Sequence, residues 1–296
     1  LFINPGDYDD TENVFYATRN TTQISRCHLM ETSPTCSALT ITGMNDEGST
    51  YAVSPHSAAN TSTVYIGTQN GELFRVESTL LAGVPTGQTI TQITLGGGVP
   101  TSNISSIAIG SSEQQLLITF SNYGVNSVWE TLNGGTTWND RDDNATLPDM
   151  PINWALYNPN NTQQVILATE AGIWGTTDIT QANPTWVRAS DIPLVRVDQL
   201  QYRPSDGQVM IITHGRGIWT AELDFVTGPV TRFVATTGND TGNNCTNDAN
   251  PCATVAHAVS EAVNGDTLNI GPGTYNEPGL LIEKDLDVQG AGVIVQ

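Results

Sequence analysis

The sequence predicts an all-β protein, and three observations lead to this fold class. Only 14% of the 296 residues are charged, and the polar character comes from Asn, Thr, Ser and Gly, which favour turns and strands over helices. Short apolar runs that fit period-two strands recur along the chain, whereas a helical pattern occurs in one short segment. Hydrophobic residues make up 38% of the chain and are too scattered for a membrane span.

A repeated pair of strands is the strongest internal pattern. Five apolar segments, spaced 50, 52, 49 and 44 positions apart, end at Thr18, Thr68, Phe120, Thr169 and Thr213. A polar turn and a second strand follow each one, which predicts hairpins near residues 14–26, 64–76, 116–130, 165–175 and 209–220. Small sheets packed radially around an axis cover one another's apolar faces. The spacing therefore predicts at least five blades of a β-propeller over residues 1–228, within a larger ring; solenoid stacking is the alternative.

One turn motif adds a family resemblance. The segment Thr131-Leu132-Asn133-Gly134-Gly135-Thr136-Thr137-Trp138 resembles the Asp-box (BNR repeat) of sialidase-like and sortilin-like propellers, with Asn133 in place of the usual Asp. The resemblance implies a turn between outer strands, in which Thr131, Asn133, Gly135, Thr137 and Trp138 are structural and not catalytic.

The composition changes after Gly228-Pro229. An amphipathic helix is predicted over residues 253–263, and short strand-like segments follow it. Residues 229–296 resemble the start of a right-handed parallel β-helix of the pectin-lyase-like group, in which such a helix caps the first coil. Leu1–Pro5 lacks the features of a signal peptide, and we expect further blades before Leu1 and further coils after Gln296.

The cysteines and the glycosylation sequons indicate an oxidising compartment. Cys27 with Cys36 and Cys245 with Cys252 bracket short polar loops, and their spacing favours local disulfides over zinc or thiol chemistry. Sequons for N-glycosylation occur at Asn20, Asn60, Asn103, Asn144, Asn160, Asn239 and Asn244. We therefore expect an extracellular or cell-surface protein.

The charge balance restricts the partners. Ten Lys and Arg residues oppose 30 Asp and Glu residues, so phosphate backbones and anionic lipid headgroups are repelled. We predict no nucleic-acid partner, no membrane insertion and no cofactor. The acidic segment Gly6–Asp10 is interpreted as a solvated loop, with calcium binding as the weaker alternative. His28, His56, His214 and His257 are scattered, which predicts no metal site.

The sequence contains no clear set of catalytic residues. A sialidase-like site would need an arginine cluster, but Arg216 is interpreted as a hydrogen-bonding residue at a blade end. Carboxylates for a glycoside hydrolase would come from Glu130, Asp140, Asp142, Asp143, Glu170 or Asp191, and their spacing selects no pair. Tyr8, Tyr123 and Trp186 are candidates for exposed aromatics that stack on sugars, although core packing is favoured for the tryptophans.

These observations predict a non-enzymatic structural or adhesive module of a large secreted or cell-surface protein. Its partners would be its own subunits or other extracellular proteins, in a fibre, sheath or surface layer. The alternative is a glycan-binding propeller or a glycoside hydrolase of the sialidase-like or sortilin-like type, which requires two carboxylates or an arginine trio in an axial pocket. A sortilin-like receptor is a third hypothesis, disfavoured because the β-helix replaces the expected cysteine-rich module.

Overall fold

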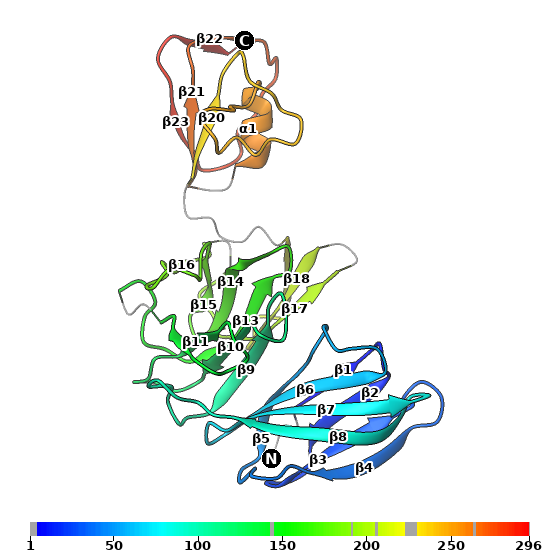
Figure 1. Ribbon diagram of the computed structural model, residues 1–296. Coiled ribbons are helices and arrows are strands. Elements are labelled where there is room, and N and C mark those ends of the chain that lie inside the picture. The colour runs from blue at the N-terminus through cyan, green and yellow to red at the C-terminus, as the bar shows by residue number, and fades with distance from the viewer. Residues whose placement is uncertain are drawn as a thin grey trace. The chain divides into compact units, whose positions relative to one another are not determined.

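The computed structural model describes residues 5–142, 145–190, 192–204, 207–222, 230–262 and 265–295 (Figure 1). The chain forms two compact units, residues 1–226 and residues 227–296. The described residues contain 24 strands and one helix of seven residues, which confirms the predicted all-β class.

The first unit consists of five antiparallel sheets, each built from strands that are consecutive in the chain. Sheet 1 contains β1 (Gly6–Asp9), β2 (Val14–Thr18), β3 (Gln23–His28) and β4 (Thr35–Thr40). Sheet 2 contains β5 (Gly48–Val53), β6 (Thr61–Thr68), β7 (Leu73–Leu81) and β8 (Val84–Ile93). Sheet 3 contains β9 (Ile104–Ile109), β10 (Leu116–Phe120), β11 (Val128–Thr131) and β12 (Asn139–Asp140). Sheet 4 contains β13 (Ile152–Asn158), β14 (Asn161–Thr169), β15 (Gly172–Thr176) and β16 (Val187–Arg188). Sheet 5 contains β17 (Val197–Arg203), β18 (Gln208–Thr213) and β19 (Ile218–Glu222).

Each hairpin expected from the sequence is an antiparallel pair within one of these sheets. The pairs are β2 with β3, β6 with β7, β10 with β11, β14 with β15, and β18 with β19. The first strands of successive sheets also lie against one another: β1 contacts β5, β5 contacts β9, β9 contacts β13, and β13 contacts β17.

Burial on both faces explains why the second strands of sheets 2 to 4 are continuous apolar runs. On β10, Leu116 and Ile118 face the core shared with sheet 2, whereas Leu117 faces the core shared with sheet 4. β14 repeats this division, with Leu167 facing sheet 3 and Ile166 facing sheet 5. A strand that packs against a neighbour on each side has no polar face, which removes the usual alternation.

A β-bulge recurs at the start of four first strands. In sheets 2 to 5 one residue of the first strand has no register partner on the second strand. These residues are Ser49, Ser105, Asn153 and Asp198. The same irregularity at the same position supports the interpretation that the sheets are copies of one module.

Side chains join the successive sheets at equivalent carbonyl groups. The first residues of β5, β9, β13 and β17 each accept a hydrogen bond from a side chain of the preceding sheet. The four bonds are Thr18 Oγ1 to Gly48 O at 2.8 Å, Ser49 Oγ to Ile104 O at 2.6 Å, Ser105 Oγ to Ile152 O at 2.5 Å, and Asn153 Nδ2 to Val197 O at 2.9 Å. The last three donors are bulged residues, so the bulge directs a polar side chain toward the next sheet.

The second unit is built from parallel strands. β20 (Thr231–Val234), β21 (Thr267–Ile270) and β23 (Asp287–Gln289) form one sheet, and β22 (Gly273–Tyr275) and β24 (Val293–Val295) form another. Both later pairings join residues 20 positions apart, since Thr267 pairs with Asp287 and Gly273 pairs with Val293. The single helix, α1 (Val255–Glu261), is shorter than the predicted 253–263; Thr254 is its N-cap, and residue 263 lies outside the described residues.

Candidate functional site

A groove runs along the first strands of the five sheets and is the main candidate for a binding site in the first unit. Its volume is about 810 Å³, and every sheet contributes lining residues. Among the lining residues, Asp7 carries a carboxylate and His56 an imidazole, and none is an arginine. The arginine trio and the carboxylate pair required for a glycosidase are thus not brought together among the described residues of this groove.

Asp7 is used to join sheets 1 and 2. Its Oδ2 accepts a hydrogen bond from the backbone N–H of Val53 at 2.7 Å, and its Oδ1 accepts one from that of Tyr8 at 2.9 Å. Burial of the carboxyl group raises the pKa of Asp7 above its usual value, and the hydrogen bonds only partly oppose this. The position of Asp7 in β1 also shows that the interpretation of Gly6–Asp10 as a loop was wrong for Gly6–Asp9, which forms a strand paired with β2.

His56 joins sheets 2 and 3 in the same groove. Its Nε2 lies 2.8 Å from the carbonyl oxygen of Gly110. Because a carbonyl oxygen can only accept, Nε2 donates. The carboxylate and the imidazole of the groove therefore both serve contacts between neighbouring sheets.

The acidic residues considered for a glycosidase are distributed over separate structural roles. Glu130 is fully buried, and its carboxylate accepts from Arg141 Nε at 3.0 Å and from Tyr157 OH at 3.0 Å. Burial, followed by the neighbouring charge of Glu130, raises the pKa of Tyr157 well above its usual value. This cluster lies between sheets 3 and 4 and makes a buried ion pair, not an open catalytic pair.

Each of the other candidate carboxylates that the structure describes contacts a neighbouring side chain or backbone group. Asp140 contacts the Asn126 amide, and Asp142 accepts from the backbone N–H of Ser127 at 2.5 Å. Glu170 pairs with Arg196 at 3.3 Å. Asp143 and Asp191 lie outside the described residues.

The motif that resembles an Asp-box forms the turn between β11 and β12. The Asn133 Oδ1 accepts from Thr137 N at 2.9 Å and from Thr131 Oγ1 at 3.0 Å, and Thr131 Oγ1 accepts from Gly135 N at 2.9 Å. Gly135 has a φ of +91°, and a Cβ there would lie 2.2 Å from the Ile93 side chain. Trp138 is buried in the core between sheets 2 and 3. These contacts close the turn.

The candidate sugar-stacking aromatics differ in their exposure. Tyr8 and Tyr123 are exposed, but Trp186 is only 2% exposed, and its Nε1 donates to the Arg141 carbonyl at 2.9 Å. The burial of Trp186 confirms the favoured expectation of core packing for this tryptophan and excludes its weaker candidate role as an exposed sugar-stacking residue. Arg216 lies in the bend between β18 and β19, where its carbonyl accepts from Trp219 Nε1 at 3.2 Å.

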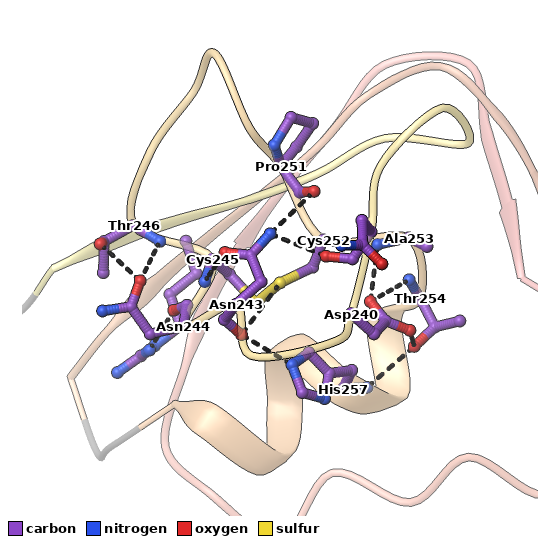
Figure 2. Close-up of a disulfide and its surroundings, with 12 residues drawn as sticks. Asp240, Asn243, Asn244, Cys245, Thr246, Pro251, Cys252, Ala253, Thr254 and His257 are labelled. Carbon is purple, nitrogen blue, oxygen red and sulfur yellow. Dashed lines mark hydrogen bonds between the residues drawn. A yellow bond between two sulfur atoms is a disulfide. The ribbon is translucent and has the colours of Figure 1, made fainter.

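Both predicted disulfides are present. Cys27 and Cys36 are register partners on β3 and β4, and their bond crosses these strands. Cys245 and Cys252 are fully buried in the second unit (Figure 2). The two bonds indicate an oxidising environment.

The loop of the second disulfide is organised around Asn243 (Figure 2). The Asn243 carbonyl accepts from His257 Nε2 at 2.7 Å, and its side-chain amide donates to the Asn239 and Pro251 carbonyls at 2.8 and 3.1 Å. Ligand atoms of Cys245, Cys252 and His257 lie within 4.8 Å of one another. Both sulfurs are covalently bonded to each other, so this arrangement offers no thiolate for a metal in the oxidised protein.

Helix α1 is capped at both ends by side chains from the irregular segment that follows β22. Glu277 accepts from the backbone N–H groups of Val255 and Ala256, both at 2.6 Å. Lys284 Nζ donates to the carbonyls of Val259, Ser260 and Ala262 at 2.9, 2.9 and 2.6 Å. Neither cap could be predicted from the sequence, because side chains that are remote in the chain leave no local signature at the helix.

The glycosylation sequons differ in how exposed their asparagine side chains are. The side chains of Asn20, Asn60, Asn160, Asn239 and Asn244 are exposed. Asn103 is partly buried, and its Nδ2 donates to Ser121 Oγ at 2.7 Å. Asn144 lies outside the described residues.

The comparisons with known proteins give no relative. No protein-family model matches the chain, and no curated protein matches it.

Among the described residues, no helix has the length and apolar character to cross a bilayer.

Proposed function

We propose that this chain is a non-enzymatic structural or adhesive module of a secreted or cell-surface protein. In this proposal the first unit consists of β-propeller blades, and the second is the start of a parallel β-helix. Its partners are further copies of its own subunits or other extracellular proteins.

The observation that carries the proposal is the use of polar groups at the sheet junctions. Four equivalent carbonyls accept hydrogen bonds from side chains of the preceding sheet, and Asp7 and His56 of the groove also bridge sheets. Catalysis requires acids, bases or nucleophiles whose reactive atoms can reach a substrate. Here the side chains of Asp7 and His56 in the groove and the junction bonds beside it hold neighbouring sheets together, as suits a rigid building block.

The second unit supports a repetitive architecture. The pairings of β21 with β23 and of β22 with β24 advance by the same 20-residue step, as successive coils of a parallel solenoid would, whereas the pairing of β20 with β21 spans 36 residues and includes α1. Helix α1 lies next to β20, the first strand of this unit, where a cap would cover the first coil.

The alternative of glycan binding has one supporting observation. Trp154 and Tyr202 line the groove and are partly exposed, and Gln199 and Gln201 supply amide groups beside them. Aromatic faces with neighbouring amides are suited to sugar rings.

Electron microscopy of the native material at high protein concentration tests the proposal. A structural module should form fibres, sheets or lattices, and isolated monomers alone would contradict assembly. A glycan array with a hydrolase assay tests the alternative. Binding that is lost on Trp154→Ala but kept on Tyr123→Ala, whose exposed ring lies outside the groove, would favour the glycan-binding function instead.

A further inference from the structure

The last strand of sheet 2 forms the longest free strand edge among the described residues of the first unit. β8 ends its sheet and has ten residues, whereas β12 and β16, which end sheets 3 and 4, have two residues each (Figure 1). Within the part of the chain that the structure describes, residues 84–93 make no backbone hydrogen bond outside their sheet. β8 therefore presents a row of unpaired N–H and C=O groups.

This edge lacks the charged side chains that usually prevent strand edges from pairing with another chain. Residues 78–112 contain no Asp, Glu, Lys or Arg, in a chain whose formal net charge is −20. Pro85 and the register shift between Thr79 and Leu80 protect only the first part of β8. Two copies of the chain repel each other over most of their surfaces, and at the edge of β8 this repulsion is weakest.

The sequence of β8 reads the same in both directions about Ile90. Residues 88–92 are Gln-Thr-Ile-Thr-Gln, and Thr86 and Thr94 occupy matching positions beyond them. Two antiparallel copies of a strand, related by a two-fold axis at Ile90, would place Gln opposite Gln, Thr opposite Thr and Ile opposite Ile. Cross-strand pairs of threonines and ladders of glutamines are favourable contacts. The strand is therefore complementary to a second copy of itself.

The side chains of β8 leave this edge accessible. Gln88, Thr89, Thr91 and Gln92 are exposed, and Ile90 is partly buried against the core between sheets 1 and 2. Val76 of β7 is the register partner of Ile90. In the paired form, the Ile90 side chains of the two copies would lie side by side and continue this apolar row from one sheet into the other.

A groove of about 610 Å³ provides space beside the second half of β8. Its lining includes Thr91–Thr94 of sheet 2 and Gly134–Trp138 of the turn between β11 and β12. Consecutive residues of a strand point to opposite faces, so a groove that takes in four of them borders the edge of the strand. In the register centred on Ile90, Thr86 and Gly87 of the other copy would face Thr94 and Ile93 at this groove.

We propose that two copies of this chain pair through β8, antiparallel and centred on Ile90, so that their two sheets 2 form one continuous sheet. The inference rests on the proposed structural function and names its partner as a second copy of the chain.

Charge substitutions at Gln88 and Gln92 test the register. Gln88→Lys combined with Gln92→Lys would place lysine opposite lysine twice, and it should weaken self-association about tenfold in sedimentation equilibrium. Gln88→Lys combined with Gln92→Glu would place lysine opposite glutamate, and it should retain or strengthen association. Both variants replace the same two exposed glutamines, so the contrast reports on pairing. General repulsion between acidic copies predicts the opposite order, because the double lysine variant has the smaller negative charge.

Cross-linking tests the position of the two-fold axis. Ile90→Cys should form a disulfide-linked dimer on mild oxidation, because residues opposite each other in a ladder lie within reach of a disulfide. Gln88→Cys should not, since Gln88 would face Gln92 of the other copy.

Three results would overturn the pairing: an unmodified chain that stays monomeric, equal association of the two glutamine variants, or equal cross-linking of Ile90→Cys and Gln88→Cys. Fibres or lattices that persist in the double lysine variant would also overturn it, but they would leave the structural function in place. Isolated monomers alone in the native material contradict that function itself.

Discussion

The side-chain amide of Asn153 donates to the carbonyl oxygen of Val197 at 2.9 Å, joining the first strand of sheet 4 to that of sheet 5. The donor is a bulged residue, and the acceptor is the first residue of the next sheet. Ser49 and Ser105 make the same connection at the two preceding junctions. The contact is therefore a repeated feature of the framework and a point at which it can be tested.

Removing one of these junction bonds should destabilise the first unit modestly. Asn153→Ala and Ser105→Ala should each lower the free energy of unfolding by about 1 kcal/mol, because each leaves a junction carbonyl without its donor; Ser105→Ala also removes a contact with Thr119 Oγ1. The double variant should show nearly additive losses, since the two bonds lie at different junctions. Urea denaturation followed by tryptophan fluorescence measures both. The exposed Thr101→Ala is the control, and losses equal to the control would contradict a role for the junction bonds.

Breaking the buried ion pair between sheets 3 and 4 should have a larger effect. Glu130→Gln leaves Arg141 buried without a counter-charge and should cost about 3–5 kcal/mol. Glu130→Gln combined with Arg141→Met should recover part of this loss, because the uncompensated charge is removed. The urea concentrations at the unfolding midpoints of the single and the double variant measure this difference in stability. A double variant no more stable than Glu130→Gln would show that the charge is not the cause.

Asp7 should contribute a pH dependence of known sign. Its pKa is raised by burial, so the folded state holds the proton more tightly than the unfolded state, whose value lies near 3.8. The contribution to stability is full below pH 3.8 and is lost as the pH rises through the elevated pKa of the folded state. Asp7→Asn should therefore gain stability relative to the unmodified protein between pH 3 and pH 7, by urea denaturation at both values. A constant difference between the two proteins would argue against a raised pKa.

Lys284 should control the end of helix α1 in the second unit. Lys284→Met removes three hydrogen bonds to helix carbonyls and should lower local stability by about 1–2 kcal/mol. Hydrogen exchange measured by mass spectrometry should show faster exchange across residues 255–262. Glu283→Gln changes the neighbouring charge without touching these carbonyls and is the control. Equal exchange in the two variants would count against the cap.

The exposed sequons should be distinguishable from Asn103 by modification. When the protein is secreted from a glycosylating host, Asn20, Asn60, Asn160, Asn239 and Asn244 are expected to carry glycans, because their side chains are exposed. Asn103 should remain unmodified, since its side chain is partly buried and its amide donates to Ser121 Oγ inside the fold. Glycopeptide mass spectrometry tests this contrast, and full occupancy of Asn103 would contradict it.

The features that the sequence predicts well depend on many residues acting together. The five hairpins are visible because several strands, β10 and β14 among them, are apolar on both faces, and the disulfides are visible because the cysteines are close in the chain. The junction bonds of Ser49, Ser105 and Asn153 could not be predicted, because a single polar residue at a bulge leaves no periodic signal. Core packing was expected for Trp186, but its hydrogen bond to the Arg141 carbonyl, 45 residues away in the chain, could not be predicted. The caps of Glu277 and Lys284 on α1 likewise depend on tertiary contacts, as does the burial of Arg26 without a carboxylate partner among the described residues.

We propose that the sheets of the first unit are copies of one module, each covering the apolar face of the next around a shared axis. An experimental density map of the full chain, from crystallography or cryo-electron microscopy, is the decisive test of this arrangement. We predict that β1, β5, β9, β13 and β17 surround that axis and that Ser105 and Asn153 contact the carbonyls of Ile152 and Val197. A map in which the first strands join one open sheet, or in which these contacts are absent, would contradict the claim.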